Sequence, residues 1–472
     1  MRMTRVDTVV RGGTVVTATG AFEAAVAIAG EQIVGVGPEP HLPPADDYID
    51  ASGKYVLPGA IDCHCHFDNA DSYELGMQAA ARAGITTVIP FATYDVANRE
   101  PLPTAIERHI ERLNRESVVD YSLNFILEHE PYILPQIPEA FRLGVTCLKA
   151  FMTYKKRPYR MASDAFLFRA MEAIAGQGGM LQLHCENGDV IGYLEDRAIE
   201  EGRTKPTEYP ATCPPWAEAE AIQRAIALDA ASGCAVYVVH LSTGTGLRHV
   251  EAAQGRGQFV MAETCPQYLL LDETEMERLG PLAKIGPPLR PADGLNQAAM
   301  WEGSAAGMIS SIGSDHAPAV KELKEKGRNN IFIDEDGLPV PFGAPSIETL
   351  VPLIHSEGVV KRGLPISWMV RMLSENPARL FGLYPRKGTI QPGADADLLI
   401  IDPLAKWTIR ADELIGNAGY TNYEGWSVTG KPWMTMLRGA VLLLDGELRQ
   451  GSGYGEFLPA GTPTPPVVVP VR

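Results

Sequence analysis

The chain has 472 residues, of which 45% are apolar and 21% charged, as in an ordinary globular protein. Its formal net charge of −17 excludes a basic surface for phosphate backbones, so we expect no nucleic-acid partner. No apolar run reaches the ~20 residues that cross a bilayer, and the start MRMTRVDTVV has no signal-peptide core. Seven cysteines without disulfide spacing complete the prediction of a reduced, cytoplasmic protein with no membrane partner.

Short β-like pieces separated by Gly and Pro fill residues 1–57. The same pattern returns late in the chain, in DLLIID (397–402) and MTMLRGAVLLLDG (434–446). Because the two ends of a chain often meet in space, we predict one small β-sandwich domain made of residues 1–57 and 385–450.

Between these ends, apolar strand-like runs alternate with helical segments such as 72–83, 102–115, 163–176 and 217–232. Eight strands are predicted, at residues 60–66, 85–91, 121–128, 145–152, 180–186, 235–241, 258–265 and 309–315. This alternation is typical of an α/β fold of the (β/α)₈ TIM-barrel type, here over residues 58–384. A doubly wound open sheet is the alternative, but it brings distant strand ends together less naturally.

The Gly/Pro-rich tail, residues 451–472, is expected to wrap over a neighbour or to be disordered. The charged run 321–326 is expected to form a solvated helix or lid.

Residues that can bind metal ions stand near the carboxyl ends of five predicted strands. His64 and His66 share one face of the first strand, because side chains i and i+2 of a strand point the same way. Cys63 and Cys65 point the other way and are interpreted as packing residues. The later strands add four more residues of this kind: Lys149, His184, His240 and Asp315. Since the carboxyl ends of barrel strands meet at one face, the pattern predicts a metal centre there.

Lys149 is unusual because an ammonium ion inside an apolar strand is costly. One interpretation is a buried lysine paired with an acid. The other is a lysine carbamylated by carbon dioxide, which converts the cation into an anionic group that can bridge two divalent ions.

Several motifs together make the sequence resemble the dihydropyrimidinase/hydantoinase branch of the amidohydrolase superfamily. They extend over nearly the whole chain: PGAIDCHCHFD, CLKAFMTY, LHCENGDVI, VVHLST, ETCPQYLLL, PPLR, GSDHAP and ENPARLFGLYPRKGTIQPGADADLLIID. The resemblance implies hydrolysis of a small, neutral cyclic amide, a 5,6-dihydropyrimidine or a 5-substituted hydantoin, to an N-carbamoyl amino acid. It also implies a homo-oligomer, a tetramer or a dimer.

The resemblance assigns roles to the metal-capable residues. Two divalent ions, zinc or alternatively manganese, cobalt or iron, would be bridged by N6-carboxylated Lys149. Asp315 would also carry the proton from the attacking hydroxide to the leaving nitrogen, and Tyr154 would hydrogen-bond the developing oxyanion. The buried ion would be held by His64, His66 and Asp315, and the outer ion by His184 and His240.

The substrate-binding positions, Tyr154, Gly286 and Phe342, depart from the family pattern twice. Gly286 stands where many members have Ser, and Phe342 lies in a loop where many have Asn. The ring substituent that the pocket accepts is therefore left open by the sequence.

Two alternatives to this function remain. One is another cyclic amidohydrolase, an allantoinase or a dihydroorotase. Against dihydroorotase, Asp68 occupies the position of the arginine that commonly holds the substrate carboxylate there, and against allantoinase, such enzymes usually lack the tyrosine that Tyr154 supplies. The other alternative is a non-enzymatic scaffold relative, which the complete ligand set disfavours.

Overall fold

A computed structural model describes residues 5–469 of the chain. Its centre is a nearly closed barrel of parallel strands in the predicted order. The strands are β8 (Ala60–Cys65), β9 (Ile85–Ala92), the interrupted β10 and β11 (Asp120–Tyr121 and Asn124–Ile126), β12 (Cys147–Phe151), β13 (Met180–His184), β14 (Ala235–Val238), β15 (Val260–Thr264) and β16 (Ser311–Ile312). The segment after the last strand is joined to the first strand by a bridge between Cys65 and His316. There the His66 amide donates a 2.7 Å hydrogen bond to the His316 carbonyl. The predicted barrel class is confirmed.

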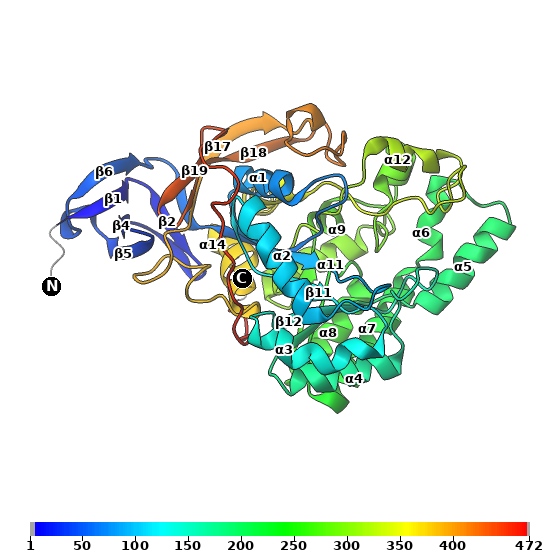
Figure 1. Cartoon of the computed structure of the whole chain (residues 1–472). Helices are drawn as coiled ribbons and strands as arrows, with labels where there is room; N and C mark the ends of the chain where they lie inside the picture. Colours follow the sequence, from blue (N-terminus) through cyan, green and yellow to red (C-terminus); the bar gives the residue numbers. More distant parts are fainter. Residues whose placement is uncertain (1–4, 470–472) are drawn as a thin grey trace.

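Helices surround the barrel (Figure 1). The longer ones are α1 (Tyr73–Ala83), α2 (Leu102–Glu116), α4 (Asp164–Ala175), α5 (Gly188–Glu200), α7 (Pro215–Ser232), α8 (Gly244–Gly255) and α11 (Leu295–Ala306). Helix α1 illustrates how the sequence sets the bounds. The Ser72 hydroxyl caps its first turn by accepting from the Leu75 amide, and Gly84 ends it at φ 89°, a conformation that glycine adopts without steric cost.

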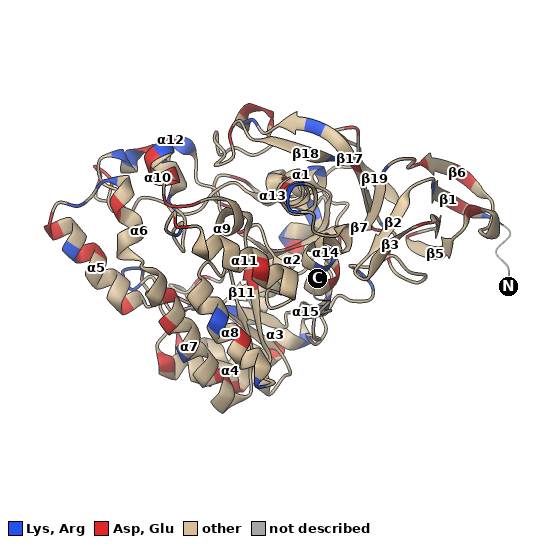
Figure 2. Ribbon diagram, turned by 180° about the vertical axis from the view of Figure 1, so that it is seen from behind, with Lys and Arg blue, Asp and Glu red and all other residues tan. Residues whose placement is uncertain are grey.

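Shorter helices connect these elements and follow the last strand. They are α3 (Ile137–Arg142), α6 (Tyr209–Thr212), α9 (Pro266–Leu270), α10 (Glu275–Arg278), α12 (Lys321–Glu325), α13 (Ile347–Leu353), α14 (Ile366–Val370), α15 (Asn376–Leu380) and the π-helical η6 (Ile354–Lys361) and η7 (Arg371–Glu375). Short 3₁₀ helices are η1 (Glu39–His41), η2 (Pro131–Gln136), η3 (Pro206–Glu208), η4 (Gly280–Ala283), η5 (Lys326–Arg328) and η8 (Ala411–Glu413). Charges of both signs are interspersed along outer helices such as α5 and α7 (Figure 2). Among residues 5–469, none of the helices combines the length and apolarity of a membrane span.

Two sheets lie beside the barrel, and the second of them contains strands from both ends of the chain (Figure 1). The first contains β5 (Gln32–Gly37), β4 (Ala25–Ala29), β1 (Val6–Arg11) and β6 (Ala45–Asp50) in that order. The second runs β20 (Glu447–Leu448), β19 (Ala440–Leu444), β18 (Ser427–Leu437), β17 (Leu398–Thr408), β7 (Tyr55–Pro58), β2 (Thr14–Thr17), β3 (Gly20–Glu23). Their facing apolar side chains, among them Val15, Ile28 and Leu398, form one buried cluster. The boundaries predicted at residues 57/58 and 384/385 stay a prediction.

The described part of the tail, residues 451–469, packs against the barrel of its own chain. The Leu458 amide donates to the Tyr121 carbonyl at 2.7 Å, and the Ala460 amide donates to the Gly144 carbonyl at 2.9 Å. Tyr121 and Gly144 lie near the amino ends of barrel strands, so the tail covers the end opposite to the predicted metal centre. The expectation of a disordered tail was wrong for these residues, because their backbone groups find partners within the same chain, while contact of the tail with a neighbouring chain stays a prediction.

Candidate active site

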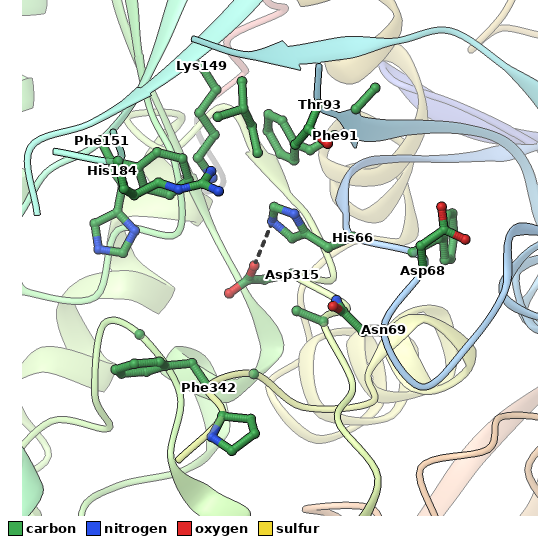
Figure 3. Close-up of a pocket in the computed structure, with 18 of the residues that line it drawn as sticks. His66, Asp68, Asn69, Phe91, Thr93, Lys149, Phe151, His184, Asp315 and Phe342 are labelled. Carbon is green, nitrogen blue, oxygen red and sulfur yellow. Dashed lines mark ion pairs between the residues drawn. The ribbon is translucent and has the colours of Figure 1, made fainter. Parts of the chain in front are cut away.

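The predicted metal-capable residues come together at the carboxyl end of the barrel, and Figure 3 shows four of them, His66, Lys149, His184 and Asp315. His64 lies in β8 and Lys149 in β12, while His184 is the last residue of β13. His240 and Asp315 follow β14 and β16 by a few residues. Parallel strands deliver all of these side chains to one face because every strand ends there.

His64, His66 and Asp315 form the tightest group. Oδ1 of Asp315 lies 3.1 Å from Nε2 of His64 and 3.8 Å from Nε2 of His66, and the two imidazole nitrogens are 3.4 Å apart. The ligand atoms of all three lie within 4.8 Å of one another. Two imidazoles and one carboxylate in this arrangement suit a divalent metal ion.

Lys149 joins the group from β12, and its surroundings bear on whether it is paired with an acid. The residue is 1% exposed, and its Nζ lies 3.1 Å from Nε2 of His64 and 4.3 Å from the ring centre of Phe91. Among residues 5–469, no carboxylate oxygen lies within 4.0 Å of this nitrogen. Burial lowers the pKa of Lys149 to about 8. The structure thus shows no direct ion pair between Lys149 and an acid of residues 5–469, and the carbamylated form stays a prediction.

His184 and His240 form a second pair, with ring centres 4.3 Å apart. Burial lowers the pKa of both imidazoles well below the usual value, so both are neutral at physiological pH, the form that binds metal. Nδ1 of His240 is buried and has no hydrogen-bond partner in the described part of the chain. A buried nitrogen of this kind normally has a partner, and a metal ion would supply it.

Two glutamates orient these histidines, and sequence reasoning missed both. Oε1 of Glu263 lies 2.6 Å from Nδ1 of His64, and Oε2 of Glu186 lies 2.7 Å from Nε2 of His184. A carboxylate behind a ligating histidine fixes the tautomer and the ring orientation. The available signal was an acid at the end of an apolar strand, as in the run VMAET of β15, and the structure shows that Glu263 in this run is fully buried.

Strained backbone marks three of the predicted site residues. Tyr154, His240 and Asp315 have φ values of 67°, 39° and 49°. Non-glycine residues rarely adopt this region, and such conformations occur preferentially at functional sites. At His240 and Asp315 the strained residue lies just beyond a strand end, where it turns a ligand toward the cluster.

The cluster opens into a cavity of about 460 Å³, large enough for a small organic molecule. Its lining includes His66, Lys149, His184, His240 and Asp315 together with the predicted substrate-binding residues Tyr154, Gly286 and Phe342. A Cβ atom at Gly286 would lie 2.8 Å from the Tyr154 hydroxyl and 3.4 Å from the Phe342 ring. The glycine thus leaves room for the side chains of its two neighbours in the pocket.

Asp68 also lines the cavity but has its charge compensated. Its two carboxylate oxygens accept from Nη1 and Nη2 of Arg112 at 2.6 and 2.7 Å. Asp68 is therefore a weaker argument against an anionic substrate such as dihydroorotate than the sequence indicated, because Arg112 holds its carboxylate in a bidentate ion pair.

The comparisons with known proteins agree with this geometry. Residues 55–442 match the amidohydrolase family, and the chain belongs to this family, whose members are generally metal-dependent.

Within the family, the relatives belong to the hydantoinase branch. The chain is 36% identical to a D-hydantoinase of Geobacillus stearothermophilus, over 95% of each chain. It is 32% identical to an L-hydantoinase of Paenarthrobacter aurescens, covering 96% of this chain and 98% of the relative. The solved structure of a dihydropyrimidinase from Brevibacillus agri superposes with a TM-score of 0.91 at 35% identity, covering 97% of this chain and 100% of the other. The predicted resemblance is confirmed.

Proposed function

We propose that this protein is a cyclic amidohydrolase that opens the neutral ring of a 5,6-dihydropyrimidine or a 5-substituted hydantoin to give an N-carbamoyl amino acid. Membership of the hydantoinase branch supports the reaction class. The observation that carries the proposal is the buried Lys149, which has His64 beside it and, among the described residues, no acid partner.

We further propose that the cluster holds two divalent ions, with zinc as the first candidate and manganese, cobalt or iron as alternatives. His64, His66 and Asp315 would hold one ion, His184 and His240 the other, and N6-carboxylated Lys149 would join them. Such ions, when bound, supply a Lewis acid for the ring carbonyl and lower the pKa of the attacking water.

The chain's own residues would then move the proton and hold the developing charge. Asp315 accepts a proton as the water oxygen attacks the ring carbonyl carbon, and it returns this proton to the ring nitrogen as the carbon–nitrogen bond breaks. The Tyr154 hydroxyl donates a hydrogen bond to the carbonyl oxygen as it becomes negative. Burial raises the pKa of Tyr154, so the phenol keeps its proton for this role.

The decisive experiment is a substrate panel with the metal-reconstituted enzyme. Dihydrouracil, 5-monosubstituted hydantoins, allantoin and dihydroorotate would be compared by chromatography of the ring-opened products. We expect kcat/KM to be highest for a dihydropyrimidine or a hydantoin. Preferred turnover of allantoin or dihydroorotate would replace the proposed substrate, and failure to open any of the rings would contradict the reaction class.

Metal analysis tests the bridging role of Lys149. The Lys149→Ala variant should bind fewer than two ions per chain, because the bridging oxygens are gone, and mass spectrometry of the wild-type holoenzyme should show a carbamate on Lys149. Two tightly bound ions in the Lys149→Ala variant would contradict the bridge.

We also propose that the protein acts in the cytoplasm as a homo-oligomer, a tetramer or a dimer. All seven cysteines are buried free thiols, as in proteins of reducing compartments. Light scattering of the purified protein would measure the oligomeric state, and a monomer at micromolar concentration would contradict it.

A further inference from the structure

Two arginines of the loop after β12 line the catalytic cavity. The guanidinium of Arg157 lies 4.7 Å from the ring centre of Tyr154 and 5.1 Å from that of Phe342. That of Arg160 lies 5.0 Å from the ring centre of Phe151. Both cations therefore stand on aromatic walls of the pocket in which the substrate is proposed to bind.

The ion pairs of this loop distinguish Arg157 from its neighbours. Lys155 pairs with Asp189 at 2.6 Å, and Arg160 pairs with Glu128 at 2.9 Å. Lys156 is likewise paired, with two acids of α5. Among residues 5–469, no carboxylate oxygen lies within 4.0 Å of the guanidinium nitrogens of Arg157. A cation at the wall of the cavity is thus left without an acid from the protein.

The acids of the cavity lining are already engaged. They are Asp68, which is bound by Arg112, and Asp315, which belongs to the proposed metal centre. Lys284 also lies near Phe342, with its nitrogen 4.3 Å from the ring centre, but that nitrogen donates to the carbonyls of Ile331 and Val340, and burial lowers the pKa of Lys284 to about 7. The guanidinium of Arg157 is therefore a charge at this wall that no carboxylate of residues 5–469 compensates within 4.0 Å, although the whole chain carries a net charge of −17.

Arg157 also stands where the substituent of a bound ring would extend. The catalytic cavity and a neighbouring cavity of about 180 Å³ share Tyr154, Arg157, Gly286 and Phe342 in their linings. A ring whose carbonyl meets Tyr154 lies beside this shared wall. A guanidinium that packs against aromatic rings keeps its N–H edge free for a carboxylate, which it can bind through two parallel hydrogen bonds.

We propose that Arg157 binds a carboxylate on the ring substituent of the substrate, so that the preferred substrates are cyclic ureides with a short acidic side chain. This inference rests on the proposed ring-opening function and specifies its substrate. The product would be the N-carbamoyl derivative of an acidic amino acid. The ring itself remains neutral, and the charge lies on the substituent.

A matched pair of substrates tests the proposal with the metal-loaded enzyme. The acid 5-(2-carboxyethyl)hydantoin and the amide 5-(2-carbamoylethyl)hydantoin have nearly the same shape but differ in charge. In the wild type we expect kcat/KM to favour the acid by about 10- to 100-fold, the range of a hydrogen bond between charged groups. In Arg157→Gln this ratio should fall to about 1, mainly through a higher KM for the acid, whereas Arg157→Lys should retain part of it.

The matched control is Arg197→Gln. Arg197 is an exposed arginine of α5 that lies 5.6 Å from the ring centre of Tyr193, and it is absent from the linings of both cavities. The control should keep the wild-type ratio of acid to amide. If Arg157 merely supports Tyr154, Arg157→Gln will lower kcat for both substrates alike and leave the ratio unchanged, which overturns the proposal, as would a wild type without preference.

Calorimetric measurement of the binding of the acid and the amide distinguishes failure of this inference from failure of the proposed reaction. If the neutral hydantoins are opened without a preference for the acid, the inference alone fails. If no ring is opened, tighter binding of the acid than the amide by the wild type, lost in Arg157→Gln, upholds carboxylate recognition while the proposed reaction fails. Equal binding of the two compounds in that case overturns both.

Discussion

Two buried lysines at different places in the molecule have opposite surroundings. Lys149 in the catalytic cluster and Lys387 at the junction of barrel and sheets are each 1% exposed. Nζ of Lys387 lies 2.6 Å from Asp120, 2.8 Å from Asp397 and 3.0 Å from Asp395. Lys149 has no carboxylate within 4.0 Å in the described part of the chain. Although burial opposes the charge of both lysines, the surrounding acids raise the pKa of Lys387, whereas that of Lys149 falls to about 8.

The difference separates a structural cluster from a chemical one. At the junction, Asp120 of β10 also pairs with Arg438, which follows β18 and donates to the Tyr454 carbonyl of the tail at 2.8 Å. The charges of this cluster are paired, and their contacts connect the barrel, the sheet and the tail. In the catalytic cluster the lysine is left without an acid, which is costly for folding but leaves its amine available for reaction.

The largest effect is expected in the catalytic cluster. Asp315→Asn should lower kcat by about 10²–10⁴-fold while most of the metal stays bound, because an amide oxygen can coordinate but cannot accept a proton. Steady-state kinetics and metal analysis of the same preparation measure both. Asp68→Asn, a cavity acid held by the partly exposed Arg112, should change kcat by less than about tenfold. Near-normal turnover by metal-replete Asp315→Asn would remove Asp315 from proton transfer.

At the junction of barrel and sheets, removal of the buried lysine should lower the stability of the fold. Lys387→Met leaves the buried Asp397 without a cation and removes one of the two cations from Asp120 and from Asp395, which keep Arg438 and Arg386, and this should lower the free energy of unfolding by about 3–5 kcal/mol. Because the folded pKa of Lys387 is raised, this contribution is fully present below the unfolded pKa of about 10.4 and is lost as the pH rises through the folded value.

Denaturant titration measures this loss. The control, Lys361→Met, removes an exposed lysine paired with Glu357 and should cost at most about 1 kcal/mol. Equal stability losses in the two variants would contradict a special role for the buried cluster.

Tyr154→Phe should reduce kcat by roughly 10²–10³-fold with little change in KM, because the hydrogen bond strengthens as the carbonyl oxygen becomes negative. Phe keeps the ring packing against His184 and Phe342. Tyr159→Phe, at a 49% exposed position of the same loop, serves as the control and should behave like the wild type. A raised KM with kcat intact would make Tyr154 a binding residue.

The smallest effect is expected in the pH dependence of the rate at which carbon dioxide and metal ions activate the metal-free enzyme. Carbon dioxide reacts with the neutral amine, and the pKa of Lys149 is about 8 in the metal-free chain. At a fixed concentration of dissolved carbon dioxide, the activation rate of metal-free enzyme should rise by about tenfold per pH unit below pH 8 and level off above it. Stopped assays after metal addition measure this rate, and a flat profile between about pH 6.5 and 9 would contradict a carbamylation-limited step.

Local sequence was enough to predict the barrel and the cluster of metal-capable residues at the carboxyl ends of its strands. Strand periodicity assigns His64 and His66 to one face, and the carboxyl ends of parallel strands always share one edge. Neither inference depends on which residues pack against each other across the fold. Motifs such as CLKAFMTY, which carry the family resemblance, are likewise local.

Tertiary structure decided the partners of the buried charges. Glu263 reaches His64 across 199 residues of sequence. Lys324, predicted to lie in a solvated run, is fully buried, and its nitrogen donates to the carbonyls of Leu282, Lys284 and Gly343. The absence of an acid beside Lys149 and beside Arg157, among the described residues, was equally invisible in the sequence. The physical reason is that burial and ion pairing depend on distances set by barrel closure and loop packing, which no local pattern of residues encodes.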